Sequence, residues 1–473
     1  MKNWLIRLAT LSLVTLSLSA IPALSQSVEA DGFRIYFQEA YRLNPSIPKG
    51  MLEAVASANT RIHNLQPGQE EDHQGMPAKY GVMGLVRDGR GYFRNSLQEV
   101  AKLSGYSEEN IAKDARINIL AFAKAYANLV VKLGIRSNDP GQQLKVVQAL
   151  SELPEGSAMH AFAMDSHLYE VMQFLNSTQD RSRYNIPNYH LKLEKVFGLN
   201  RYSVLSSPRV MASPGLVQGS NGGLYKQSGA QAACKDYPTA LWVAASTSNY
   251  NQRYDTAITA VTIHTMQGSY AGTISWFQNP TADVSAHYSM RSRDGQITQM
   301  VCESDRAWHV GSENGYTVGI EHEGWVEEDG WYTEALYQSS ANLVMDIAHE
   351  YNINTTTCYK GASSTKVQVL GEDYRIKGHQ HFKNQSHTDP GIRWNWPKFY
   401  ALVNPVTEVL KPMSRSKGTS LGFMAAIPEN FRGNLYQIDG QIIRKAPTNN
   451  GSATSMGTTS RLPSLILFTN SQE

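Results

Sequence analysis

The sequence predicts a multidomain protein in which a helical N-terminal domain precedes an α/β domain and a small C-terminal β unit. Its 473 residues exceed the length of one ordinary domain. Up to about residue 200, apolar residues recur at helical spacing. Beyond residue 234, apolar runs typical of buried strands alternate with helical stretches, which indicates an α/β sheet. From Lys411 onward the chain is polar and rich in loops.

Two helices of the N-terminal part can be bounded from the sequence. One is expected from Ile47 to about Ile62, with Pro48 in its first turn. A longer helix is expected to begin at Ser107, which can cap it, and to end before Gly134. Its apolar residues keep helical spacing: Ile117, Leu120, Ala123, Ala127, Val130 and Val131.

The boundaries between the domains follow from shifts in composition. Residues 201–233 are rich in Gly, Ser and Ala and lack a sustained apolar period, so we expect a linker there. Near the C-terminus, a hairpin is expected around Asp439-Gly440 and a final strand over residues 461–470. The expected domains are residues 27–200 (helical), 234–405 (α/β) and 406–473 (loop-rich with a small β unit).

Three strands and one helix can be placed within the α/β part. Strands are expected over residues 257–264, 296–302 and 317–324, because these runs are apolar and rich in β-branched residues. A helix is expected over residues 333–351, with Thr333 as its N-cap.

The composition and the N-terminus narrow the functional classes. Lys and Arg number 43 against 41 Asp and Glu, so the chain lacks the basic footprint of a nucleic-acid-binding protein. Three cysteines allow at most one disulfide within the chain, and the sequence does not say which pair forms it. They are Cys234, Cys302 and Cys358.

Residues 1–25 are expected to be a signal peptide. Lys2 and Arg7 form a charged start, Leu8–Leu24 carries no charge, and Ala23 and Ser25 supply the small residues of a cleavage site. The apolar run falls short of the roughly 20 residues that span a bilayer, so no stable membrane insertion is expected after cleavage. We therefore expect a secreted, periplasmic or cell-envelope protein.

Two histidines and one aspartate stand out as candidate metal ligands. His264 ends an apolar run, and His379 precedes Asp389 by ten residues. Asp389 lies in an Asp-Pro-Gly turn, which restrains its carboxylate. Three protein ligands plus water are typical of catalytic zinc, whereas a structural zinc is normally closed by a fourth protein ligand. His381 is an alternative to His379, because residues i and i+2 share one face of a strand.

Further motifs lie between these residues. Residues 284–311 contain SAHY and RAWHVG, and residues 316–325 contain VGIEHEG. Together with the IH strand end and GH followed by HTDPG, these motifs resemble the zinc N-acetylmuramoyl-L-alanine amidases of the amidase 2 type, which are related to phage amidase lysozymes and peptidoglycan recognition proteins. The resemblance runs from about Asp236 to Val403 and keeps the family's order of motifs.

This resemblance implies a fold, an activity and a cofactor. The fold is a central mixed β-sheet flanked by helices. The activity is hydrolysis of the amide bond between N-acetylmuramic acid and L-alanine in peptidoglycan or muropeptides, as in cell-wall degradation. The cofactor is Zn²⁺, and His264, His379 and Asp389 match its ligands.

The resemblance also implies roles for other residues. Glu321 matches the catalytic glutamate, with Glu323 as the alternative on the same strand face. His387 stands where many relatives have a lysine that stabilises the oxyanion. The positions that match the family's substrate groove are His287, Trp308 and His309.

The N-terminal part resembles a lytic transglycosylase, which implies a lysozyme-like helical domain over about Ile47–Leu133. The position of that family's acid glutamate reads Asn59, and an amide cannot protonate a glycosidic oxygen. Glu53, about a turn and a half away, is a poor substitute. We therefore expect this domain to be inactive, and a glycan-cleaving enzyme is the least favoured function.

A non-catalytic peptidoglycan-binding recognition protein is the main alternative to an amidase. Relatives of that kind lose a zinc ligand, whereas this chain has all three candidates. The sequence therefore favours the enzyme.

Overall fold

The computed structural model describes most of the chain between residues 32 and 405. The described ranges are 32–66, 75–226 and 246–405, apart from residues 214, 247 and 255, and the backbone of 435–438 and 441–444. The expected signal peptide, Cys234 and the strand expected over residues 461–470 lie outside them.

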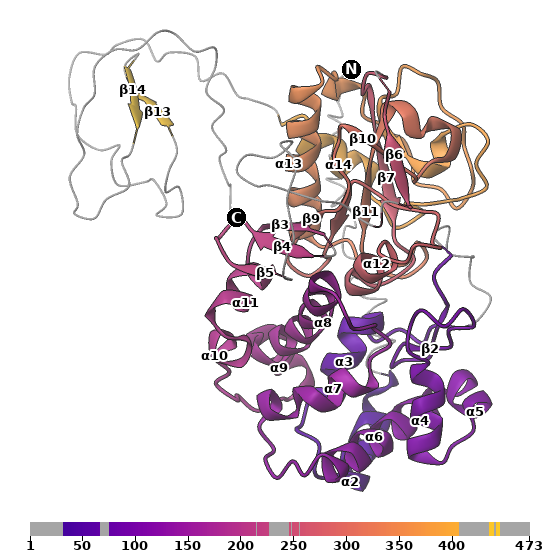
Figure 1. Cartoon of the computed structure of the whole chain (residues 1–473), viewed down its shortest axis with the longest axis vertical. Coiled ribbons are helices and arrows are strands. Elements are labelled where there is room, and N and C mark those ends of the chain that lie inside the picture. The colour runs from indigo at the N-terminus through magenta and orange to yellow at the C-terminus, as the bar shows by residue number, and fades with distance from the viewer. Residues whose placement is uncertain are drawn as a thin grey trace, which may run out of the picture. The chain divides into compact units, whose positions relative to one another are not determined.

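The N-terminal part is helical, as the sequence predicts (Figure 1). Every residue of α3 (Met51–Thr60) is buried, and α3 packs against α8 (Ala158–Asn176). Around this pair lie α2 (Arg34–Leu43), α4 (Ser96–Ser104), α5 (Glu108–Lys113), α6 (Ala115–Lys132), α7 (Leu144–Leu150), α9 (Thr178–Tyr184), α10 (Leu193–Phe197) and α11 (Leu199–Leu205). Short pieces complete the part: β1 (Lys79–Tyr80), β2 (Leu85–Val86) and the 3₁₀ turn η1 (Pro140–Gln143).

The single helix expected between Ser107 and Gly134 is two helices. Ser107 does cap α5, but α5 ends at Lys113 and Asp114 adopts an extended backbone. The carboxylate of Asp114 then accepts the amide proton of Ile117 over 2.9 Å and so caps α6. The apolar spacing continues across this break, which is why periodicity alone did not reveal it.

The α/β part is built on a mixed sheet of eight strands, which confirms the expected fold class. The strand order is β12-β7-β11-β8-β9-β3-β4-β5. The pairs β12/β7, β7/β11, β11/β8 and β9/β3 are parallel, and the other three are antiparallel. The strands are β3 (Arg209–Ala212), β4 (Leu216–Gly219), β5 (Leu224–Lys226), β7 (Ala260–Thr265), β8 (Tyr288–Met290), β9 (Ile297–Gln299), β11 (Thr317–His322) and β12 (Ile376–Gly378).

Helices cover both faces of this sheet. On one face lie α13 (Glu334–Glu350) and α14 (Trp396–Val403) (Figure 1). Val261, Ile263, Val318 and Ile320 belong to one apolar cluster with residues of these two helices. Thr333 caps α13 as expected. On the other face, α12 (Tyr270–Trp276) bonds through the hydroxyl of Tyr270 to the side chains of Gln296 and Thr298. Smaller elements complete the part: β6 (Tyr250–Gln252), β10 (Asp305–Ala307), η2 (Gly311–Tyr316), η3 (Thr355–Thr357) and η4 (His379–His381).

The stretch expected to be a linker contains three strands of the sheet. β3, β4 and β5 all lie within residues 201–233, and β3 pairs with β9. Val210, Ala212 and Val217 are buried at alternate positions, but the runs are four residues or shorter and are interrupted by Gly and Ser. Apolar runs this short cannot be distinguished from a linker by sequence alone. The division of the chain into domains stays a prediction.

The helical part and the sheet share one hydrophobic core. Buried residues of α12 belong to the same apolar cluster as those of α3, α6 and α8. The ring of Trp276 stacks on Phe93, with centroids 5.8 Å apart. The hydroxyl of Tyr92 donates to the carbonyl of Ser275. Burial of α12 therefore depends on the helical part.

A buried arginine of the helical part also reaches the sheet. Arg61, at the C-cap of α3, lies with its guanidinium 3.3 Å from Glu170 and 3.8 Å from Glu323. The same guanidinium lies 4.5 Å from the ring centroid of Trp331. Because a buried carboxylate needs a partner, Arg61 stabilises Glu323 just beyond the end of β11.

Three sequence expectations concern the remaining parts. The expected C-terminal hairpin is present as β13 (Leu435–Ile438), which pairs antiparallel with β14 (Gln441–Arg444). Cys302 is disulfide-bonded, whereas Cys358 is a free, buried thiol. In the described part of the chain, every helix is too short or too polar to cross a membrane.

Glu53 gives a pH-dependent test of the helical core. Burial raises the pKa of Glu53 from 4.5 to about 7, although its hydrogen bond from Tyr41 opposes the rise. Its stabilising neutral form is fully present below pH 4.5 and is lost as the pH rises through about 7. From pH 4 to pH 8 the free energy of unfolding of Glu53→Gln should therefore gain about 3 kcal/mol relative to the unmodified protein. Urea unfolding at both pH values measures this, and a pH-independent difference would contradict it.

Candidate metal centre and active site

The register of two central strands brings His264 and Glu321 together. β7 and β11 run parallel, and His264 pairs with Glu321. Side chains alternate between the faces of a strand, so both residues point away from the α13 core, to which Ile263 and Ile320 belong. His264 is fully buried, and its Nδ1 lies 3.9 Å from a carboxylate oxygen of Glu321.

The other two candidate ligands come from the segment after β12. His379 begins η4, and Asp389 follows in the turn that closes beneath Gly378. A Cβ at Gly378 would lie 2.4 Å from Pro390, so this close approach requires glycine. The amide of Gln380 donates to the carbonyl of Asp389 over 2.9 Å and ties the two ends of the segment together.

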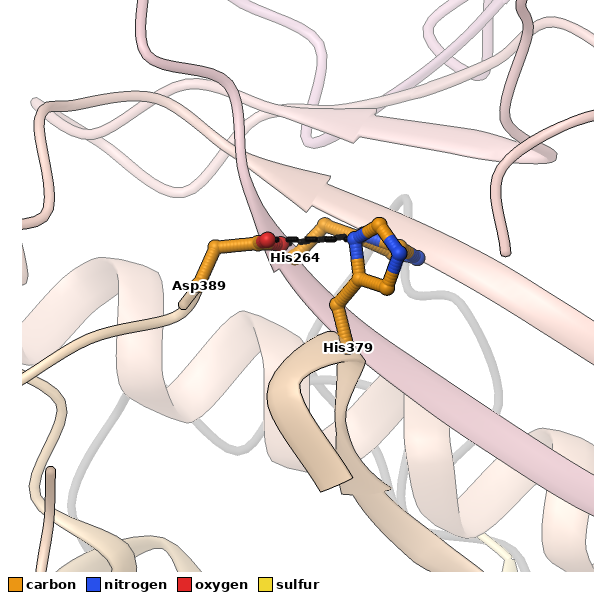
Figure 2. Close-up of side chains that lie close together, drawn as sticks. All are labelled: His264, His379 and Asp389. Carbon is orange, nitrogen blue, oxygen red and sulfur yellow. Dashed lines mark hydrogen bonds and ion pairs between the residues drawn. The ribbon is translucent and has the colours of Figure 1, made fainter. Parts of the chain in front are cut away.

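His264, His379 and Asp389 form a compact buried group (Figure 2). Their candidate ligand atoms all lie within 4.8 Å of one another. Nδ1 of His264 lies 3.0 Å from one oxygen of Asp389, and Nδ1 of His379 lies 3.1 Å from the other. A tetrahedral zinc ion with ligand distances of about 2 Å would hold neighbouring ligand atoms roughly 3.3 Å apart. Both the donor types and their spacing fit zinc.

Burial also favours the neutral form of His264 and of two histidines near it. Burial lowers the pKa of His264, against the opposing effect of the Glu321 carboxylate. Burial lowers the pKa of His309 and of His287 well below the ordinary value. A neutral imidazole is the form that binds a metal ion, so the environment prepares His264 for that role.

His381 does not join the group. η4 is a 3₁₀ turn, so residues two apart do not share a face as they would on a strand. The ring of His381 packs against Tyr359 and Trp396, at centroid distances of 4.5 Å and 5.5 Å. Its Nδ1 accepts the amide proton of Gly378. The geometry therefore favours His379 among the two alternatives.

Glu321 and Glu323 have different surroundings. Glu321 lines a cavity of about 310 Å³ together with His379 and His387. Glu323 instead accepts the amide protons of Tyr270 and Ser292, at 2.9 Å and 2.8 Å. Its carboxylate thus joins the start of α12 to the end of β8, which is a structural position.

Of the three residues expected in the substrate groove, two line the cavity and one does not. Trp308 and His309 line the same cavity as Glu321, whereas His287 is fully buried and lies outside the lining. Nδ1 of His287 accepts the amide proton of Gly319, which is why it cannot turn toward the cavity. The structure thus places His287 behind the cavity wall, and its contact with substrate stays a prediction.

His387 lies where the sequence expected an oxyanion donor. Its ring lines the cavity, and its centroid lies 4.9 Å from that of His379. Sequence reasoning missed Gln385, which also lines the cavity and contacts Nε2 of His379 over 2.7 Å. No residue pattern distinguishes this glutamine from an ordinary loop residue.

Such a set, with one candidate base beside three candidate metal ligands at a cavity, is what a metal-dependent hydrolase requires. A family model described as N-acetylmuramoyl-L-alanine amidase (Amidase_2) matches residues 254–392. N-acetylmuramoyl-L-alanine amidase A of Achromobacter lyticus is 43% identical over 170 residues, which cover 36% of this chain and 96% of that protein. The chain therefore belongs to the N-acetylmuramoyl-L-alanine amidase family, as the five motifs indicated.

One further relative and one solved structure are also similar to part of the chain. The 1,6-anhydro-N-acetylmuramyl-L-alanine amidase AmpD of Citrobacter freundii is 32% identical over 130 residues, which cover 26% of this chain and 58% of that protein. Among solved structures, the N-acetylmuramoyl-L-alanine amidase LysC from Clostridium intestinale is 18% identical, with a TM-score of 0.24. That match covers 36% of this chain and 99% of the other.

Metal analysis tests which histidine is a ligand. After dialysis, His379→Ala should lose bound zinc, whereas His381→Ala should keep about one equivalent, because His381 only packs against aromatic rings. Inductively coupled plasma mass spectrometry measures both, with circular dichroism as the control for folding. Zinc loss confined to a folded His381→Ala would show that the wrong histidine has been chosen.

Proposed function

We propose that this chain is a zinc-dependent enzyme that hydrolyses the amide bond between N-acetylmuramic acid and L-alanine in peptidoglycan. The observation that carries the proposal is the buried group of His264, His379 and Asp389, which lies next to Glu321 at a cavity in a member of the amidase family. A zinc ion held by three such ligands would act as a Lewis acid and lower the pKa of water to about 7.

Glu321 is the proposed general base. Its carboxylate lies at the cavity and near His264, whereas Glu323 is held by backbone amides. In this role Glu321 takes a proton from the attacking water and passes it to the departing nitrogen of L-alanine. Its burial leaves little water to compete for that proton.

His387 is the proposed donor to the oxyanion of the tetrahedral intermediate. The ring lines the cavity beside His379, so an N–H of His387 can point at the position where negative charge develops. Trp308 forms another part of the cavity wall, and its indole donates to Asn251 over 2.9 Å. That bond restrains the ring, so we assign Trp308 a contact with the substrate.

The helical domain is proposed to support the amidase and to lack its own chemistry. Asn59 is buried, and its amide donates to the carbonyl of Met83 over 2.9 Å. Glu53 is buried beneath Tyr41. Asn59 is not an acid, and the carboxyl group of Glu53 is buried, so neither residue can protonate a glycan. Both observations support an inactive domain.

Export completes the proposal. We assign residues 1–25 to a signal peptide on the strength of their charge and apolar pattern, which places the mature protein outside the cytoplasm or in the cell envelope. N-terminal sequencing of the protein from the periplasm or medium tests this, since a chain beginning at Met1 would contradict it.

Digestion of purified sacculi tests the activity. The full-length protein should release new L-alanine amino groups, and a recognition protein would bind without releasing any. New saccharide ends in place of amino groups would overturn the proposal in favour of glycan cleavage.

Glu321→Gln should reduce the rate on sacculi about 10²–10⁴-fold while zinc and fold are retained, because an amide cannot accept the proton. The matched control is Glu327→Gln, the same change at an exposed side chain, which should leave the rate unchanged. If Glu321→Gln is as active as this control, the base has been assigned to the wrong residue.

A further inference from the structure

The side chain of His309 belongs to a row of hydrogen bonds that ends on a backbone carbonyl. The hydroxyl of Thr317 donates to the carbonyl oxygen of Glu313 over 2.9 Å. A hydroxyl has one proton, so Thr317 must accept in its other contact, 3.2 Å from Nε2 of His309. The proton of the neutral His309 ring is therefore on Nε2, and its Nδ1 accepts.

The position of the proton on His309 determines the tautomer of the candidate ligand His264. Nδ1 of His309 lies 2.9 Å from Nε2 of His264. Because Nδ1 of His309 accepts, Nε2 of His264 carries the proton. A neutral imidazole has only one N–H, so Nδ1 of His264 keeps its lone pair, and this is the atom 3.0 Å from Asp389. The lone pair on Nδ1 of His264 and the carboxylate oxygen of Asp389 repel each other unless a cation lies between them.

A second row of hydrogen bonds, through Gln385, determines the tautomer of His379 in the same way. The amide nitrogen of Gln385 donates to the carbonyls of Val310 and Lys383, over 3.2 Å and 3.1 Å. These two carbonyls identify the nitrogen end of the amide, so the oxygen end faces Nε2 of His379 over 2.7 Å. Nε2 of His379 must then donate, which leaves its Nδ1 to face Asp389.

Both rows meet at two adjacent residues that the fold holds firmly. The amides of His309 and Val310 donate to the same side-chain oxygen of Asn314, over 2.9 Å and 2.7 Å. The ring of His309 fills the space above Gly319, where a Cβ would lie 2.6 Å from the ring. A larger residue at Gly319 would push the ring away from His264.

We propose that the segment His309-Val310 sets the tautomer of both histidine ligands, so that each presents Nδ1 to the metal. The inference rests on the proposed zinc site and deepens it. His309 acts through its side chain on His264, and Val310 acts through its carbonyl and Gln385 on His379. His309 is thus a positioning residue, and the substrate contact expected from the sequence stays a separate prediction, since its ring also lines the cavity.

Zinc affinity tests this role separately from catalysis. Residues that orient metal-bound histidines typically change metal affinity about 10–100-fold, so Thr317→Val and Gln385→Leu should each weaken zinc binding by that range. Thr317→Ser keeps the hydroxyl and should bind zinc like the unmodified protein. His349→Ala, at an exposed histidine of α13, is the control for loss of an imidazole, and His309→Ala should weaken binding where His349→Ala does not.

The measurement is competition with a zinc chelator on the full-length protein, with circular dichroism to confirm folding. Unchanged affinity in folded Thr317→Val and Gln385→Leu would overturn the inference while the zinc site stands. Failure of the unmodified protein to bind zinc would overturn the site and this inference with it.

Nuclear magnetic resonance of the zinc-loaded, ¹⁵N-histidine-labelled protein provides an independent readout. Long-range ¹H–¹⁵N spectra should show the proton of His264 and of His379 on Nε2. A proton on Nδ1 of either residue would contradict the proposed direction of the hydrogen bonds.

Discussion

The parallel pairing of β7 with β11 is the constraint on which the site depends. Its register sets His264 beside Glu321, and both side chains face the cavity side of the sheet. Because side chains alternate along a strand, a slip of one residue would turn His264 and Glu321 into the apolar core beneath α13. The burial of Ile263 and Ile320 in that core therefore fixes the register.

The helical part stabilises this arrangement through α12, which lies on the face of the sheet opposite α13. α12 is buried within the helical core, and the chain that follows it supplies Phe277, Val284 and Ser285 to the wall of the cavity. Arg61 neutralises Glu323, which joins α12 to the end of β8. The helical part thus contributes to the amidase whether or not it has chemistry of its own, because the segment that forms part of the cavity wall follows directly after α12.

Much of the fold and of the candidate site could be predicted from the sequence, because the motifs that indicate them are local. The strand ending at His264, the helix capped by Thr333 and the Asp-Pro-Gly turn each carry their own signal, and the order of the motifs indicated the family. The three strands within residues 201–233 did not, because they are short and interrupted by Gly and Ser. His379 could not be separated from His381 by position alone, since the choice depends on a 3₁₀ turn that sequence spacing does not encode. The direction of the bonds at His309 required a hydroxyl, a carbonyl and two rings to be located in space.

Anomalous diffraction at the zinc absorption edge, from crystals of the full-length protein, tests the central claim most directly. The account predicts one strong peak within about 2 Å of Nδ1 of His264, Nδ1 of His379 and the carboxylate of Asp389, with Glu321 facing the remaining position. A zinc ion bound through Nε2 of either histidine, or centred on His381 or His387, would contradict it.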